Sequence, residues 1–354
     1  MKVDGRVPNR KRNKGLFFLL LIALLLGATL LSLGAGQVKI SAGAMLSVLV
    51  KLVGLPAEWL GTAPTPEQIA VIQHIRLPRT IVGLLVGAAL AVSGAVMQGV
   101  FGNPLADPGM IGISAGASLG AVIAVSLGLT AVSLYYMPFF ALIGALAAVA
   151  ATVALAMRDG KIPVMPLLLA GVAVSMFVGA VTSGMLTFMN EYRLREFLFW
   201  MVGGLDYRRW EHVGLAVGPV LTGIVILCAL ARHLNILAMG EQEARAVGMP
   251  VVRFRLALLF IAAVTTATAV CVSGSIGFVG LVVPHVLRLL LGPEHRVLLP
   301  ACALAGAIFL VSCDTLGRVL IPPAEIRVGI ITALTGAPYF LYLLRRAQKA
   351  GGAL

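Results

Sequence analysis

Charged residues are scarce in this sequence. Only 12% of its 354 residues are Asp, Glu, Lys or Arg, and 60% are hydrophobic, whereas soluble domains carry about 25% charged residues. The share of surface that a soluble fold can bury saturates with chain size, so it cannot hide this much apolar surface. Apolar runs of roughly 20 residues, the length that crosses a bilayer, recur along the chain. The composition excludes a soluble globular protein and predicts an all-α polytopic membrane protein.

Motifs for nucleotide and metal chemistry are also missing. The sequence has no G-x-x-x-x-G-K-[ST] phosphate loop and no H-E-x-x-H pair, so we expect neither ATP hydrolysis nor zinc peptidase activity of that type. A G-x-S-x-G match at 112–116 opens an expected membrane helix instead of following a strand, which argues against a nucleophile elbow. No acid, base or metal-binding groups converge at one depth, which counts against a membrane enzyme. We expect no cofactor and no metal in this chain.

The four cysteines are isolated from one another. Without C-x-x-C spacing a zinc site is not expected, and small buried hydrophobic side chains are the simpler interpretation. They are Cys228, Cys271, Cys302 and Cys313.

Ten apolar segments are expected to span the membrane within a single domain that covers 1–354. Glycines at small-xxx-small spacing, such as Gly83 and Gly87, or Gly112, Gly116 and Gly120, predict close contacts between these helices. The segments are 16–33, 80–100, 110–130, 137–157, 164–190, 212–231, 256–273, 276–292, 297–313 and 328–344.

The distribution of positive charge predicts the topology. An even number of spans places both termini on one side. If that side is the cytoplasm, it receives the basic tail 1–14, the loop 237–250 and most of the Lys and Arg residues. This is the positive-inside asymmetry of membrane proteins. It accounts for the formal net charge of +13 without a nucleic-acid partner.

Ionisable residues are missing from the middle of the expected spans. No Lys, Asp or Glu lies there, although such residues usually mark ion and proton pathways. Their absence disfavours an ion-coupled secondary transporter, which stays open as an alternative because Gly-rich and broken spans also fit that class.

The loop 237–250 contains a predicted short amphipathic helix. Small residues alternate with Glu241, Glu243 and Arg245, and Gly248 is placed to end the helix. A helix of this kind suits the cleft of a partner protein, although an ordinary solvated loop helix has the same pattern.

Several motifs, in order, resemble one transporter family. The pattern from Gly240 to Gly248 resembles the loop by which ABC importer permeases contact their ATPases. The segments 76–79, 87–98, 103–117, 277–285, 295–300 and 336–340 are similar to the permeases of iron-siderophore, heme and cobalamin importers. The resemblance covers about 70 to 345.

The resemblance implies a type II ABC importer permease in a prokaryotic cytoplasmic membrane. It implies a homodimer, two cytoplasmic ATPase subunits that bind ATP-Mg, and an external substrate-binding protein. The residues implied for ATPase coupling are Gly240, Glu241, Glu243, Ala244, Arg245 and Gly248.

The resemblance also implies two further functional regions. Arg76, Arg79 and Arg318 match arginines that face outward in the family and pair with glutamates of the binding protein, a contact suited to the bidentate guanidinium. Snorkelling arginines would explain the same positions. Arg327 departs from the family, where Pro is common, and either changes the docking surface or forms a local ion pair.

The family closes its cytoplasmic gate at a turn that matches a short segment of this chain. The matching residues are Asn103, Pro104 and Leu105. A tight turn between helices would explain the same prolines.

Candidates for the substrate pathway are Gln98, Met185, Phe188 and Met189. Methionine-rich surfaces adapt to large ligands, but simple core packing is the more common explanation for such Met and Phe side chains. The implied substrate is a metal chelate, with ferric siderophore or heme expected ahead of cobalamin. A molybdate-like oxyanion is the alternative within the family.

Overall fold

The computed structural model describes residues 14–38, 40–52, 54, 64–158 and 160–349. This part of the chain is almost entirely helical, with two isolated β-bridges and no strand. The helices are α1 (Lys14–Gly34), α2 (Ala42–Leu52), α3 (Pro66–Ala70), η2 (Val71–Arg76), α4 (Leu77–Phe101), η3 (Pro108–Ile111), α5 (Ile113–Ser126), η4 (Leu129–Ala131), α6 (Tyr136–Ala156), α7 (Val164–Thr187), α8 (Glu191–Met201), α9 (Trp210–Ala229), α10 (Ala231–Leu237), α11 (Glu241–Ala246), α12 (Val251–Ser273), α13 (Val279–Leu291), α14 (His295–Val319) and α15 (Val328–Lys349).

Each of the ten expected spans coincides with a helix. Seven helical segments of the described chain are long and apolar enough to cross a membrane. The other three spans, represented by α5, α13 and the apolar part of α15, are shorter. The predicted all-α polytopic membrane fold is therefore confirmed. Most of the basic tail predicted over 1–14 lies outside the described residues.

Two predicted boundaries were wrong in ways that affect function. The span expected at 297–313 continues as α14 to Val319, so Asp314 lies inside a membrane helix and not after it. The span expected at 80–100 is part of a continuous 36-residue helical segment from Pro66 to Phe101. It therefore contains Arg76 and Arg79. The amphipathic helices α2 and α8 were not predicted.

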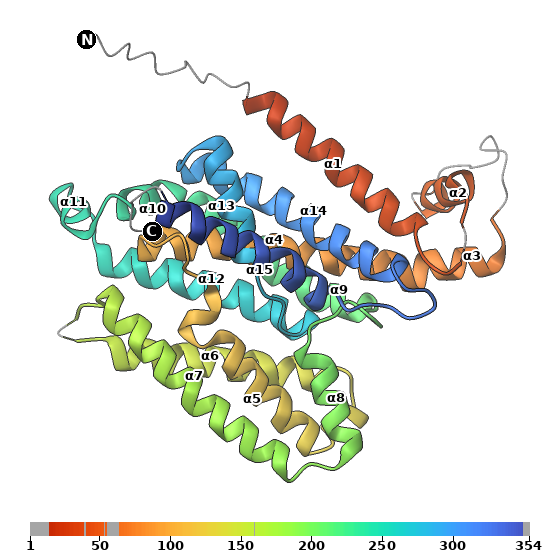
Figure 1. The fold of residues 1–354 in the computed structure, drawn as a ribbon, viewed down its shortest axis with the longest axis horizontal. Coiled ribbons are helices and arrows are strands. Elements are labelled where there is room, and N and C mark those ends of the chain that lie inside the picture. Colours follow the sequence, from red (N-terminus) through yellow and green to blue (C-terminus); the bar gives the residue numbers. More distant parts are fainter. Residues whose placement is uncertain (1–13, 39, 53, 55–63, 159, 350–354) are drawn as a thin grey trace.

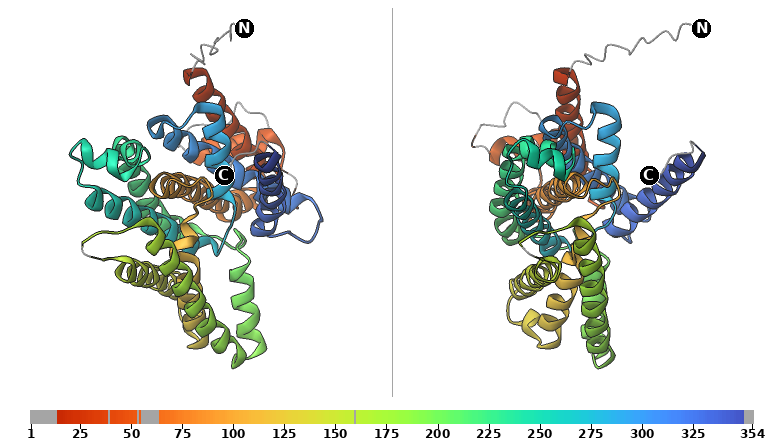
Figure 2. Two further views of the ribbon diagram at one scale, coloured as in Figure 1. Left: turned by 60° about the vertical axis from the view of Figure 1, so that its left-hand side comes forward. Right: turned by 90° about the vertical axis from the view of Figure 1, so that its left-hand side faces the viewer.

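The α4 helix occupies the centre of the molecule. Nearly all of its residues are buried, and it packs against α9, α12, α13 and α14. Helices α5 to α8 form a lobe on one side of this centre (Figures 1 and 2). The α11 helix lies at one end of the long axis, and α2 and α3 lie at the other (Figure 1). We call these the inner end and the outer end.

Glycines bring helices into contact at two crossings. A Cβ added to Gly87 would overlap the carbonyl group of Gly306, where α4 crosses α14. A Cβ added to Gly116 would overlap the carbonyl group of Gly144, where α5 crosses α6. The predicted packing role of Gly87 and Gly116 is confirmed, because only glycine leaves room for these backbones to meet.

Both ends of the described chain point toward the inner end. The α15 helix finishes there, and α1 starts toward it (Figure 1). The side chain of Lys14 forms a 3.4 Å ion pair with Glu294 in the turn before α14. The first residues of α1 therefore lie beside an inner turn.

Candidate functional site

The segment 237–250 forms the predicted short helix at the inner end. The α11 helix starts after Gly240, whose φ is 132°, and Gly248 has a φ of 77° while its N–H donates to the carbonyl oxygen of Arg245 at 2.9 Å. Both angles favour glycine. Ala244 is fully buried against the protein, while Glu243 and Arg245 are exposed. One face of α11 is thus seated on the permease and the other is free.

A buried arginine holds α11 in place. The carboxylate of Glu241 lies 2.6 Å from Arg245 and 3.0 Å from Arg255 of α12. Arg255 also donates to the carbonyl oxygen of Ile162, just before α7, at 2.6 Å. Burial alone would raise the pKa of Glu241, but hydrogen bonds and charge from the two arginines lower this pKa below its usual range. Arg255 therefore connects α11, α12 and the turn before α7.

A cavity of about 600 Å³ lies next to this region, between the end of α4, α10 and the start of α14. Gln98 and Pro104 line it, together with Met239 from the residues just before α11. The structure thus brings one predicted pathway residue and one predicted gate residue to the same inner cavity. Arg288 adds a positive charge to its lining.

The predicted gate residues form a compact turn. The side-chain oxygen of Asn103 accepts a 2.9 Å hydrogen bond from the N–H of Leu105, an Asx turn that holds the loop in shape. The carboxylate of Asp107 accepts from the N–H of Gly109 at 2.8 Å and caps η3. These contacts describe a tight turn beside a cavity, and the gate role of Asn103, Pro104 and Leu105 stays a prediction.

The predicted pathway residues do not lie together. Gln98 is buried near the inner end of α4 and donates to the carbonyl oxygen of Gly280 at 3.2 Å. Met185 lies in the last turn of α7 and Phe188 directly follows that helix, away from the inner end where Gln98 lies. The Phe188 side chain is 91% exposed. Met185 and Met189 pack partly against the core. A shared lining role for these four residues stays a prediction.

Arg76 is buried at the outer end. It donates to the carbonyl oxygens of Leu33 at 2.7 Å, Gly34 at 2.8 Å and Val38 at 2.6 Å. The last carbonyl groups of a helix lack partners within the helix and carry partial negative charge. Arg76 therefore caps the end of α1.

Arg79 is the centre of a buried ion cluster. It makes a bidentate contact with Asp314, at 3.0 and 2.8 Å for the closest atom pairs, and contacts Glu325 at 2.8 Å and Asp206 at 3.1 Å. Arg318 lies 3.3 Å from Asp314 and bonds to the hydroxyl group of Ser32 at 2.7 Å. These contacts join α1, α4, α14 and two outer loops.

The position of Arg327 identifies it as part of the same cluster. It lies 3.8 Å from Asp206, and its guanidinium stacks 4.5 Å from the centre of the Phe199 ring. Arg79, Arg318 and Arg327 together balance the negative charges of the three acidic residues. The acidic partners were absent from the predicted site, because Asp206 and Glu325 lie in loops and Asp314 was placed beyond its span.

The three predicted docking arginines are thus buried, each at 7% exposure or less. Most of their donors have acceptors within the chain, with the Nε–H of Arg318 as an exception, so contact with another protein requires exchange of these bonds or contact through their acidic partners. The docking role stays a prediction, and the structure supplies the intramolecular bonds with which docking would compete.

Comparison with known proteins gives a family. A model of the FecCD transport family matches residues 22–346. The cobalamin import system permease protein BtuC of Halobacterium salinarum is 48% identical over 282 residues, 80% of this chain and 75% of that protein. The hemin transport system permease protein HmuU of Yersinia pestis is 43% identical over 284 residues, 78% of this chain and 84% of that protein. The vitamin B12 import system permease protein BtuC of Salmonella paratyphi A is 38% identical over 351 residues, 99% of this chain and 100% of that protein.

Two solved structures resemble the fold. One, an inward-facing conformation of an ABC transporter assigned to the metal-chelate type, has a TM-score of 0.82 at 32% identity and covers 94% of this chain and 99% of that chain. The other, PsaBC from Streptococcus pneumoniae in complex with Fab, has a TM-score of 0.55 at 17% identity, with 77% and 92% covered. The second supports the fold alone.

The fold and these matches define a multi-pass membrane permease, the subunit of a transport system that provides the passage through the membrane. The chain belongs to the FecCD transport family, whose model covers nearly all of it.

Proposed function

We propose that this permease is the membrane subunit of a binding-protein-dependent ABC importer driven by separate ATPase subunits. The observation that carries the proposal is α11, a short helix at the inner end with one face anchored and one face free. Glu243 is exposed on the free side, and the exposed apolar side chains of Met239 and Val247 flank the helix. Such a mixed surface suits the cleft of a partner protein.

Arg255 provides a route from α11 into the membrane. Because it binds Glu241 and the carbonyl oxygen of Ile162, a displacement of α11 pulls on α12 and on the turn before α7 together. In our proposal, ATP binding closes the partner ATPases and moves α11. Helices α12 and α7 then favour one of two states, with the Asn103–Leu105 turn as the inner gate. Transport follows because ATP binding and release change which of the two gate states is the more stable.

The proposed assembly is a homodimer with two ATPase subunits, which bind ATP-Mg, and one external binding protein. The start of α1 and the end of α15 lie toward α11, which supports cytoplasmic termini in a prokaryotic inner membrane. Nucleic acid has no role. The binding protein docks at the outer end, where Arg76, Arg79 and Arg318 position the surface by holding α1, α4 and α14 together.

We propose a metal–tetrapyrrole chelate as the substrate. The support is the similarity to permeases named for cobalamin and for hemin. The sequence alone favoured iron chelates over cobalamin because iron importers are common. The cobalamin permeases include the relative at 48% identity and the one that covers 99% of this chain. We therefore place cobalamin first and heme second.

The test begins with gentle purification of the tagged chain from native membranes, followed by mass spectrometry of its partners. We expect a stoichiometric ATPase with a phosphate loop. The complex in vesicles should then take up cyanocobalamin only with ATP and the cognate binding protein. Purification without an ATPase, or uptake abolished by an uncoupler in the presence of ATP, would favour an ion-coupled secondary transporter. Tight molybdate binding by the binding protein, without chelate binding, would replace the chelate with an oxyanion.

A further inference from the structure

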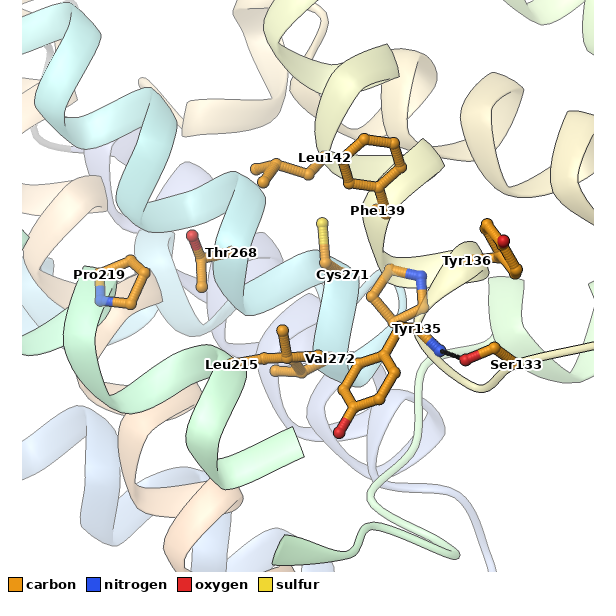
Figure 3. A pocket seen from close by; sticks show the side chains of 11 residues that line it. Ser133, Tyr135, Tyr136, Phe139, Leu142, Leu215, Pro219, Thr268, Cys271 and Val272 are labelled. Carbon is orange, nitrogen blue, oxygen red and sulfur yellow. Dashed lines mark hydrogen bonds between the residues drawn. The ribbon is translucent and has the colours of Figure 1, made fainter. Parts of the chain in front are cut away.

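An apolar groove lies between α6 and α9 toward the outer end. Both helices pack against α12 and have little contact with each other. A cavity of about 490 Å³ opens between them. Phe139 and Leu142 of α6 line one side, Leu215 and Pro219 of α9 line another, and Cys271 of α12 lies between them (Figure 3).

The groove lies in the outer part of the membrane. It follows α6 from Tyr136, at the start of the helix, to Leu142, and it reaches Pro219 on α9. Six residues of helix rise about 9 Å, which keeps the groove within the outer half of the roughly 30 Å hydrocarbon layer. Tyr135 and Tyr136 at this end of the groove are exposed, as is Trp210 at the start of α9, and aromatic residues of this kind mark the membrane–water boundary. The groove therefore suits the first part of a single acyl chain in the outer leaflet.

A polar cavity continues from the shallow end of the groove. It has a volume of about 180 Å³ and shares Ser133, Pro138 and Cys271 with the groove. This volume is well above the roughly 10–15 Å³ that one water molecule needs. Its further lining residues include the apolar side chains of Leu134 and Met137 and the polar or charged side chains of Glu196, Trp200, Arg208 and His212.

Two residues that line this polar cavity each carry a buried donor without an acceptor in the described part of the chain. These donors are the indole N–H of Trp200, whose side chain is only 6% exposed, and the Nε–H of Arg208. Buried N–H groups are nearly always paired in proteins. An anionic group bound in this cavity would lie beside the side chains of both residues.

The charges around the cavity specify a zwitterion. Burial lowers the pKa of Arg208 to about 10, so this side chain is still positively charged at neutral pH. Glu196 lines the same cavity, and no ion pair to it occurs among the described residues. The carboxylate of Glu196 would repel a ligand that is only anionic, and the guanidinium of Arg208 would repel a ligand that is only cationic. A headgroup that carries one charge of each sign suits both.

We propose that this site binds one phospholipid with an ethanolamine headgroup. The phosphate lies at Arg208 and Trp200, the ammonium group lies at Glu196, and one acyl chain follows the groove between α6 and α9. The bound lipid fills the gap that the two helices leave over α12. The inference goes beyond the proposed function and does not depend on the transported substrate.

The experiment is native mass spectrometry of the full-length permease after release from nanodiscs that contain equal amounts of phosphatidylethanolamine and phosphatidylglycerol. We expect wild type to retain one phosphatidylethanolamine per chain. Arg208→Gln and Glu196→Gln should each lower this retention by about fivefold or more, since each removes a charge-assisted hydrogen bond. Leu215→Trp should abolish it by filling the groove.

Matched controls separate the site from ordinary surrounding lipid. Arg195→Gln and Glu191→Gln change exposed charges on α8, and Leu221→Trp changes an exposed leucine on α9, all outside both cavities. These variants should retain the lipid as wild type does. Equal loss in controls and site variants, or equal retention of both lipids in every variant, would overturn the site. Preferred retention of phosphatidylglycerol would overturn the assigned headgroup. The near-isosteric Glu196→Gln variant keeps the test valid if Leu215→Trp fails to fold.

Discussion

The guanidinium group of Arg255 lies 3.0 Å from the carboxylate of Glu241 and 2.6 Å from the carbonyl oxygen of Ile162. One buried side chain therefore connects a loop helix at the inner end to two membrane segments that are far apart in sequence. The arginine side chain is 5% exposed and the glutamate side chain is 37% exposed. The ion pair thus joins a glutamate at the surface to an arginine in the core.

Substitution of Arg255 should weaken coupling. Arg255→Gln loses the charge that holds Glu241, so we expect ATP-driven uptake in vesicles to fall roughly five- to tenfold, in the range of typical coupling energies. ATPase activity of the complex should persist. The control is Arg253→Gln, an exposed arginine on the same helix. Uptake at the wild-type level in Arg255→Gln would remove the positioning role.

Charge reversal on the free face of α11 tests the ATPase contact. Glu243→Arg should leave the permease folded and inserted, because Glu243 is exposed. We expect the yield of co-purified ATPase, or the transport per ATP hydrolysed, to drop about tenfold or more. Gln242→Arg adds a charge at the neighbouring exposed position and should have the smaller effect. Equal behaviour of the two variants would argue against a specific contact at Glu243.

The Arg79–Asp314 pair should stabilise the outer end as a unit. Removal of one partner leaves an uncompensated buried charge, so Asp314→Leu is expected to lower the free energy of unfolding by about 3–5 kcal/mol. Arg79→Met with Asp314→Leu should recover part of this loss. Thermal unfolding of the purified variants measures both effects. A double variant less stable than either single variant would contradict the proposed pairing.

The same double variant tests docking. If Arg79 only holds the helices together, the double variant should bind the external protein more tightly than Asp314→Leu does, in step with the stability that it recovers. If the guanidinium itself exchanges partners with the binding protein, the affinity of the double variant should stay about tenfold below wild type, as for a lost charged contact, although its stability recovers in part. Binding of the cognate protein to the permease in nanodiscs measures the difference.

The Gly87–Gly306 crossing should not tolerate even one methyl group. A Cβ at position 87 overlaps the Gly306 carbonyl group, so Gly87→Ala must separate α4 from α14. We expect a loss of about 1–3 kcal/mol from this overpacking, with a lower unfolding temperature. The control is Gly179→Ala on α7, where an added Cβ meets nothing within 4 Å. That change should be neutral or slightly stabilising.

Several features of the fold were predictable because they depend on local sequence. Runs of apolar residues located all ten spans, and the glycines around α11 predicted a short helix that the structure contains. The predicted span ended before Asp314, because a charged residue in a sequence normally indicates the end of an apolar run. The helix continues to Val319. In the structure its charge is compensated by Arg79, which lies 235 residues away in the sequence.

The candidate site was predictable only in part. The motif around Gln98 and Pro104 was identified, and both residues line one cavity, but no sequence pattern indicated that Phe188 would lie at the opposite end of the molecule. Arg255 offered no signal either, since an arginine at the start of a membrane helix is ordinary on the cytoplasmic side. Its role depends on Glu241 and Ile162, which reach it only after the helices pack.

The sequence by itself determined that this chain lives in a bilayer, where its helices lie and to which family its motifs belong. Composition, run length and ordered motifs carry that information without reference to contacts. Tertiary structure alone decided that Arg79 and Arg318 are buried in an ion cluster, that Arg255 holds α11, and that a groove separates α6 from α9. These features depend on which distant residues meet in space, because a buried charge is stabilised only by the partners that packing brings to it.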